Sequence, residues 1–204
     1  MLSKYLIIGL VRTLTGVRAR WREGAEPSLA QRIYFANHTS NLDAVVIWAS
    51  LPTELRRKTR PVAAHDYWTK GIVRPYLAKH VFNVVLIERK NVTVKNNPLT
   101  PMLAALDAGS SLIIFPEGGR MAGGGLGEFK SGIHHLATKR PGVELVPVWI
   151  DNVNRVLPKG EFLPVPMLGS VTIGAPMTLL AEETKDGFLT RARTALAELG
   201  GIES

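Results

Sequence analysis

Hydrophobic and polar positions form two alternating kinds of segment from residue 31 onward. Short apolar runs bounded by proline, glycine or polar residues are typical of buried strands. Six runs are predicted as strands: Gln31–Ala36, Arg60–His65, Val81–Ile87, Ser111–Phe115, Glu144–Ile150 and Val171–Ile173. Segments with helical character lie between or after them. The predicted helices run from Ser40 or Asn41 through Ser50, from Asp66 to about Lys79, from Thr100 to Gly109 and over Glu182–Leu199.

This order of elements predicts an α/β fold. Strands separated by helices of about 10–15 residues indicate one layered domain with a mostly parallel central sheet flanked by helices. We place this domain at residues 25–204, because no internal repeat or interdomain linker interrupts it. A chain of 204 residues with 46% hydrophobic residues is long enough and apolar enough to bury one sizeable core.

Residues 1–24 form a separate segment ahead of this domain. The first 22 positions hold no acidic residue and five basic ones: Lys4, Arg12, Arg18, Arg20 and Arg22. On a helical projection most apolar side chains, Trp21 among them, fall opposite the basic ones. We therefore predict an amphipathic helix on an anionic membrane surface, at its cytoplasmic face. A helix packed on its own domain and a signal peptide are the alternatives. No spanning helix is expected, because such a helix needs about 20 apolar residues.

The charge balance narrows the class of partner. The chain has 25 Lys and Arg against 17 Asp and Glu, a formal net charge of +8 at pH 7. This favours nucleic acid, acidic lipid or a phosphorylated substrate. No nucleic-acid-binding module is visible, so we expect no nucleic acid partner. The absence of cysteine excludes a disulfide framework, a thiolate metal site and a cysteine nucleophile.

The first candidate for chemistry is a histidine followed by an aspartate. His38 lies in the polar loop after the first predicted strand, and Asp43 lies five residues later, just inside the next helix. At this spacing the carboxylate can accept the Nδ1–H of the imidazole, which leaves Nε2 free as a base. Because histidine titrates near neutral pH, it can take a proton from a hydroxyl group. Alone, this spacing also fits a helix cap or a surface polar pair.

The second candidate is the turn after the strand Ser111–Phe115, with the sequence Phe-Pro-Glu-Gly-Gly-Arg over residues 115–120. Proline ends the strand, the glycines permit a tight turn, and Arg120 has the planar guanidinium that matches phosphate oxygens. Glu117 would repel a phosphate, so we expect it to orient an arginine or shape the turn. The glycine-rich stretch lacks the G-x4-G-K-[ST] pattern of a Walker loop. The alternative interpretations are a strand end with a solvated Glu–Arg pair and, for the glycine-rich stretch, a mobile surface loop.

Together and in this order, the two candidates resemble the glycerolipid acyltransferase family. That family carries His-x4-Asp and, about 70–80 residues later, Phe-Pro-Glu-Gly-x-Arg. Here His38 and Glu117 are 79 positions apart. Three further segments match, and the similarity covers roughly residues 33–176: Asn83–Arg89, a Phe-Lys-Ser-Gly segment at 129–132, and Val-Pro-Val at 146–148. Two positions differ from the usual family pattern, since Gly119 stands for threonine and Asn83 for glycine.

The resemblance implies an O-acyltransferase. It makes His38 the general base and Asp43 the residue that orients it. It also implies a region that binds the acceptor's phosphate, made of Arg89, Glu117, Gly118, Gly119, Arg120 and Lys130. The free hydroxyl of a lysophospholipid, first among them 1-acyl-glycerol-3-phosphate, would attack the thioester of acyl-CoA or acyl-carrier protein.

The resemblance implies no cofactor beyond the acyl thioester and no metal ion. The other histidines show no metal-ligand spacing, and we expect core or surface roles for them: His65, His80, His134 and His135. Three alternatives stay open: a different lyso-lipid or hydroxylated lipid as acceptor, a non-catalytic lipid-binding module, and a thioesterase. A serine hydrolase has little support, because the G-x-S-x-G pattern is absent.

Overall fold

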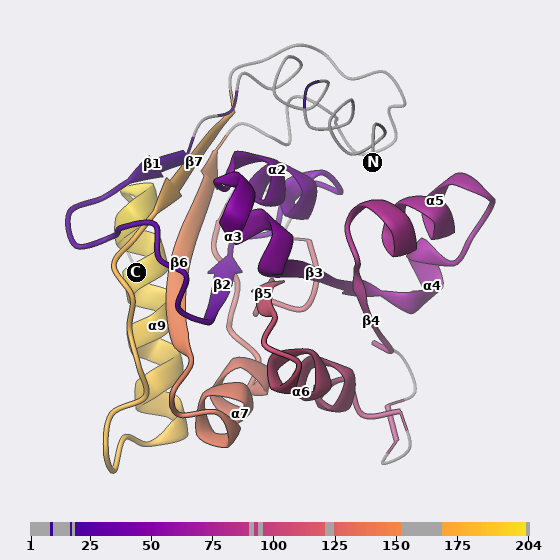
Figure 1. Ribbon diagram of the computed structural model, residues 1–204. Coiled ribbons are helices and arrows are strands. Elements are labelled where there is room, and N and C mark those ends of the chain that lie inside the picture. Colours follow the sequence, from indigo (N-terminus) through magenta and orange to yellow (C-terminus); the bar gives the residue numbers. More distant parts are fainter. Residues whose placement is uncertain are drawn as a thin grey trace.

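The computed structural model describes residues 9, 17, 19–89, 92–93, 96–120, 125–151 and 169–202. These residues form a seven-stranded sheet with helices on both faces, which confirms the predicted α/β class (Figure 1). The strands are β1 (Ala19–Trp21), β2 (Arg32–Ala36), β3 (Thr59–Ala64), β4 (Val85–Ile87), β5 (Ser111–Ile114), β6 (Glu144–Asp151) and β7 (Ser170–Ile173). The helices are α2 (Asp43–Ser50), α3 (Thr53–Lys58), α4 (His65–Trp68), α5 (Val73–Tyr76), α6 (Leu99–Asp107), α7 (Gly132–Lys139) and α9 (Lys185–Gly200), with a π-helical turn η1 (Leu77–Val81).

The sheet is mostly parallel, as the sequence predicts. Its strands lie in the order β1-β7-β6-β2-β5-β3-β4, and only the β6–β7 pair is antiparallel. The central strand β2 pairs with β5 and with β6, and every residue of β2 and β5 is buried. Phe35 pairs with Ile114, so the carboxyl ends of β2 and β5 lie side by side. Ligands of open α/β sheets bind at this edge.

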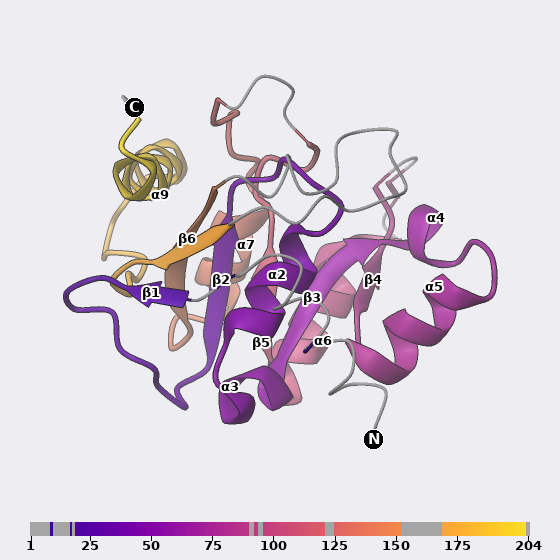
Figure 2. The ribbon, with the colours of Figure 1, turned by 90° about the horizontal axis from the view of Figure 1, so that it is seen from above.

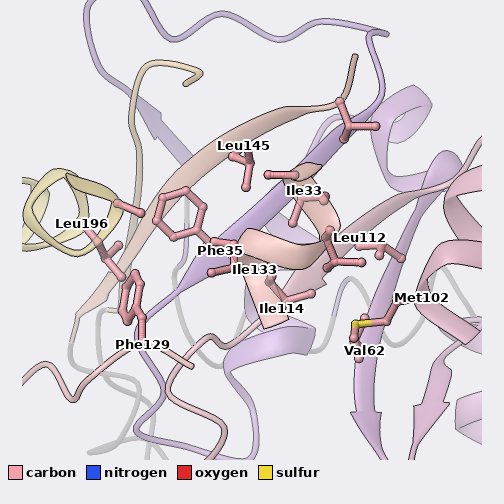
Figure 3. Packing of buried hydrophobic residues seen from close by; sticks show 14 of the residues in the cluster. Ile33, Phe35, Val62, Met102, Leu112, Ile114, Phe129, Ile133, Leu145 and Leu196 are labelled. Atoms are coloured by element: carbon pink, nitrogen blue, oxygen red, sulfur yellow. The ribbon is translucent and has the colours of Figure 1, made fainter. Parts of the chain in front are cut away.

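Side chains of β2 alternate between two hydrophobic layers, because successive residues of a strand face opposite sides of the sheet. Ile33 and Phe35 join the cluster formed with α6, α7 and α9 (Figure 3). Tyr34 and Ala36 join the cluster formed with α2 and α3. Phe35 meets Phe129 edge to face, with ring centroids 6.2 Å apart. This contact anchors the segment that follows the glycine-rich loop.

The region between β3 and β4 differs from the prediction. One helix was expected over Asp66–Lys79, but the chain forms α4, α5 and η1. Gly71 has a φ of +73°, which a helix does not accommodate, and it separates α4 from α5. The strand expected over Val81–Ile87 begins only at Val85, because Asn83 has a positive φ of 50°. Helix α7 was not predicted.

The N-terminal prediction is wrong at its C-terminal end. Residues Ala19–Trp21, expected in the helix over 1–24, form β1 and pair with β7 in parallel. Trp21 packs against the core cluster of the α2 face and is not available to a membrane-facing stripe. Val17 and residues 22–24 are not helical either, and Val17 is buried in the same cluster. Apart from Gly9, the remaining positions of the predicted helix lie outside the described residues, and there the helix stays a prediction. Over the ranges given above, no helix combines the length and apolar character needed to cross a membrane.

Candidate active site

The loop after β2 and the start of α2 bring His38 and Asp43 together. Nδ1 of His38 lies 2.9 Å from Oδ2 of Asp43, the contact that the sequence predicts. The same oxygen accepts the backbone N–H groups of Thr39 and Ser40, each at 2.7 Å. The Asp43 side chain is fully buried, whereas the His38 side chain is 19% exposed. The carboxylate therefore fixes the imidazole through Nδ1, and Nε2 takes no part in this contact.

The ring of Phe115 packs against the face of the same imidazole. The rings of His38 and Phe115 stack with centroids 4.1 Å apart and an interplanar angle of 19°. Phe115 follows β5 directly, so the strand next to β2 supplies this support. Sequence reasoning named Phe115 only as part of a motif and missed the stacking, because nothing along the chain indicates which ring it meets.

Glu117 connects two loops. Its Oε1 accepts the backbone N–H of His38 at 2.9 Å, and its Oε2 accepts that of Gly127 at 3.1 Å. The residue is 7% exposed. Burial raises the pKa of this carboxyl, although the N–H groups of Gly127 and His38 act in the opposite direction. Of the two expected roles, shaping the turn matches this geometry, since both partners are backbone groups.

Gly118 and Lys130 lie against each other beside this turn. Gly118 has a φ of +71°, and a Cβ added to it would lie 2.8 Å from Cδ, Cε and Nζ of Lys130. The backbone N–H of Lys130 donates to the carbonyl of Pro116 at 2.9 Å. Gly119 is different, because a Cβ there would meet nothing within 4 Å. The turn therefore requires glycine at 118 but not at 119.

A cavity of about 620 Å³ adjoins these residues. Polar or charged lining side chains include His38, Arg89, Arg120, Lys130 and His135. Apolar lining residues come mostly from the strands and from α4, α6 and α7: Val62, Ala64, Trp68, Ile87, Leu99, Met102, Ile114, Ile133 and Leu136. The volume lies in the range of small-molecule sites. Three cations and a candidate base thus share one cavity with largely apolar walls.

Most, but not all, of the site residues predicted from the sequence line this cavity. Arg89, Gly118, Arg120 and Lys130 line it together with His38, whereas Glu117 lies behind the turn. Arg89 also forms an exposed ion pair, with its Nη2 3.7 Å from Oδ1 of Asp66. The sequence indicated Asp66 only as the start of a predicted helix. No group of three or more histidine and acidic side chains in the described part of the chain is placed to hold a metal ion.

Comparison with protein families gives a match to the family described as Acyltransferase over residues 23–151, more than half of the chain. The chain belongs to the acyltransferase family. The matched region includes both motifs, so the resemblance inferred from them is confirmed. It also includes five of the seven strands, β2 to β6, whereas β1 lies before it and β7 lies after it.

Curated relatives of this acyltransferase-family chain carry similar names. A 1-acyl-sn-glycerol-3-phosphate acyltransferase of Limnanthes alba is 28% identical over 170 residues, which cover 80% of this chain and 56% of that protein. The chloroplastic 1-acyl-sn-glycerol-3-phosphate acyltransferase BAT2 of Brassica napus is 31% identical over 129 residues, covering 63% and 35%. The matches thus span about half of the Limnanthes protein and a third of the Brassica protein.

A solved structure supports the same fold. The crystal structure of the 1-acyl-sn-glycerophosphate (LPA) acyltransferase PlsC from Thermotoga maritima superposes with a TM-score of 0.70. The match covers 98% of this chain and 80% of that chain, at 22% sequence identity. At this identity the likeness establishes the architecture of the acyltransferase-family chain.

Proposed function

We propose that this protein is an O-acyltransferase that moves a fatty acyl group from a thioester to the free hydroxyl of 1-acyl-glycerol-3-phosphate, giving phosphatidic acid. The observation that carries the proposal is the cavity in which the His38–Asp43 pair shares one site with Arg89, Arg120 and Lys130. Guanidinium and ammonium groups suit a phosphomonoester, and apolar walls suit an acyl chain. The names of the relatives support the same acceptor.

In the proposed reaction, Nε2 of His38 takes the proton of the acceptor hydroxyl. The hydroxyl oxygen then attacks the thioester carbonyl carbon and forms a tetrahedral oxyanion. Collapse of this intermediate breaks the carbon–sulfur bond, and the leaving thiolate takes the proton back from His38. Asp43 stabilises the imidazolium that exists between these steps. The acyl group passes directly from sulfur to oxygen, so no covalent enzyme intermediate forms.

We further propose that the reaction takes place at the cytoplasmic face of a membrane, with either acyl-CoA or acyl-carrier protein as donor. A lysophospholipid and its product both partition into bilayers, so an enzyme that handles them gains from contact with that surface. The net charge of +8 favours an anionic surface. The part of the predicted basic helix that precedes Val17 would add to this attachment.

Activity with purified protein tests the proposal. The protein with an acyl thioester and lysophosphatidic acid should yield phosphatidic acid, and His38→Ala should abolish this conversion. His65→Ala is the matched control, because His65 is exposed and does not line the cavity. Full turnover by His38→Ala would refute the general-base role. Equal release of free fatty acid with and without acceptor would instead favour a thioesterase.

A second variant tests the acceptor. Arg89→Ala should raise the apparent KM for acceptors that carry a phosphomonoester and leave it nearly unchanged for a hydroxylated lipid without one. The reason is that a guanidinium contributes most when it faces a charged phosphate. A KM increase of the same size for both acceptors would contradict phosphate recognition by Arg89. Parallel assays with acyl-CoA and acyl-carrier protein identify the donor.

A further inference from the structure

A group of apolar side chains protrudes into solvent between α4 and η1. Ile72 is 91% exposed, Val73 67% and Tyr76 50%. They include the two most exposed large apolar side chains in the described part of the chain, and all lie within five residues. Residues 69–80, termed the α4–α5 tip below, lie at the end of the sheet opposite α9 (Figure 1, Figure 2). Concentrated apolar exposure of this kind indicates a contact surface.

The charge of the α4–α5 tip indicates the kind of surface that it contacts. The tip holds Lys70, Arg74 and Lys79 and no acidic residue. The guanidinium carbon of Arg74 lies 4.3 Å from the centroid of the Tyr67 ring, which fixes this cation beside the apolar side chains. Apolar groups next to cations match a bilayer whose headgroups are anionic and whose interior is hydrocarbon.

The α4–α5 tip is continuous with the cavity of the candidate active site. Tyr67 and Trp68, the residues just before the tip, line that cavity. Val92 lines it as well and is 53% exposed. The tip is therefore joined to the wall of the cavity that holds His38, both along the chain and through the contact of Arg74 with Tyr67.

We propose that the α4–α5 tip inserts into an anionic lipid bilayer next to the entrance of the cavity. Ile72 and Val73 enter the boundary between headgroups and acyl chains, while Lys70, Arg74 and Lys79 contact lipid phosphates. A lipid acceptor can then pass from the bilayer to His38 along apolar side chains. The direction of this passage rests on the proposed function, whereas the insertion of the tip does not.

A fluorescent probe tests insertion directly. Because the chain has no cysteine, Ile72→Cys provides a single labelling site for an environment-sensitive dye. Leu180→Cys is the matched control, since Leu180 is 56% exposed and precedes α9 at the other end of the sheet. Phosphatidylglycerol vesicles should shift the emission at 72 to the blue and leave that at 180 unchanged. No shift at 72, or a shift with acyl-carrier protein but not with vesicles, would overturn the proposal.

Paired double variants separate binding from catalysis. Ile72→Ser with Val73→Ser should weaken binding to phosphatidylglycerol vesicles about tenfold relative to Leu29→Ser with Leu180→Ser, because two apolar side chains no longer enter the bilayer. Turnover of a short-chain acceptor in solution should be the same in both. Equal vesicle binding by the two pairs would refute insertion. If the unaltered protein fails to acylate the short-chain acceptor while binding differs, the proposed function fails and insertion stands.

Discussion

The backbone N–H of His38 donates a hydrogen bond to the carboxylate of Glu117 at 2.9 Å. These residues are 79 positions apart and follow neighbouring strands, β2 and β5. The link therefore joins the loop that carries the candidate base to the turn that precedes Arg120. It makes the two sequence motifs one structural unit rather than two separate ligands of a substrate.

Glu117→Gln should lower kcat about 10- to 100-fold, the range that follows when about 1–3 kcal/mol of buried hydrogen bonding is lost from the transition state. A glutamine amide has only one oxygen, so it cannot accept from both His38 and Gly127. Initial rates at saturating donor and acceptor measure the effect. Glu128→Gln is the control, because Glu128 is exposed, and its kcat should be nearly that of the unaltered protein. Equal rates for these two variants would show that the link does not position His38.

The raised pKa of Glu117 predicts a pH dependence of stability. Burial raises this pKa above its ordinary value of 4.5, so the folded chain holds the proton more tightly than the unfolded chain. The contribution of Glu117 to the free energy of unfolding then falls as the pH rises from 4.5 through the raised pKa. The stability advantage of the unaltered protein over Glu117→Gln should therefore shrink towards neutral pH. Urea unfolding of both proteins measures this, and an advantage that grows with pH would contradict it.

Phe115→Leu should reduce kcat about tenfold with a smaller change in KM, because the stacked ring fixes the plane of the His38 imidazole and not the substrate. Phe115→Tyr keeps an aromatic ring of the same shape and should restore most of the rate. The comparison requires steady-state kinetics of both variants. If leucine and tyrosine give the same rate, the stacking has no role in positioning the base.

Gly118→Ala should destabilise the protein by about 1–2 kcal/mol, because alanine is strained at a positive φ. Its Cβ also displaces the Lys130 side chain, so the KM for a phosphate-bearing acceptor should rise. Gly119→Ala is the matched control and should stay within about 0.5 kcal/mol, since space is open there. Thermal unfolding and acceptor titration compare the two. Equal effects at both positions would refute a specific requirement at Gly118.

Several parts of the fold follow from local sequence alone. The strands β2, β5 and β6 are continuous apolar runs that only a sheet covered on both faces can bury, so their positions are predicted within one residue. The His38–Asp43 contact is equally local, because five residues around the start of a helix determine it. The family resemblance added the roles of Arg89 and Lys130, which no local pattern indicates.

Other parts depend on contacts that sequence periodicity does not report. The three-residue strand β1 forms because β7 offers an edge, and the same residues fit an amphipathic helix in isolation. Helix α7 buries only Ile133, Leu136 and Ala137 between polar residues, and a glycine-rich stretch precedes it. The sequence did not indicate the partners of Glu117 either, since its hydrogen bonds with the N–H groups of Gly127 and His38 join residues 10 and 79 positions apart.

The central place of β2 has a consequence for synthesis of the protein on the ribosome. In β2, Ile33 pairs with Leu112 of β5, and Ala36 pairs with Val148 of β6, so both partners of β2 come much later in the chain. Until the chain has been made past Val148, the fully buried β2 has at least one unpaired edge. Parallel pairing over such separations is slow and exposes edges that favour aggregation. The nascent chain therefore needs protection for most of its synthesis, and truncated chains that end before β6 should be insoluble.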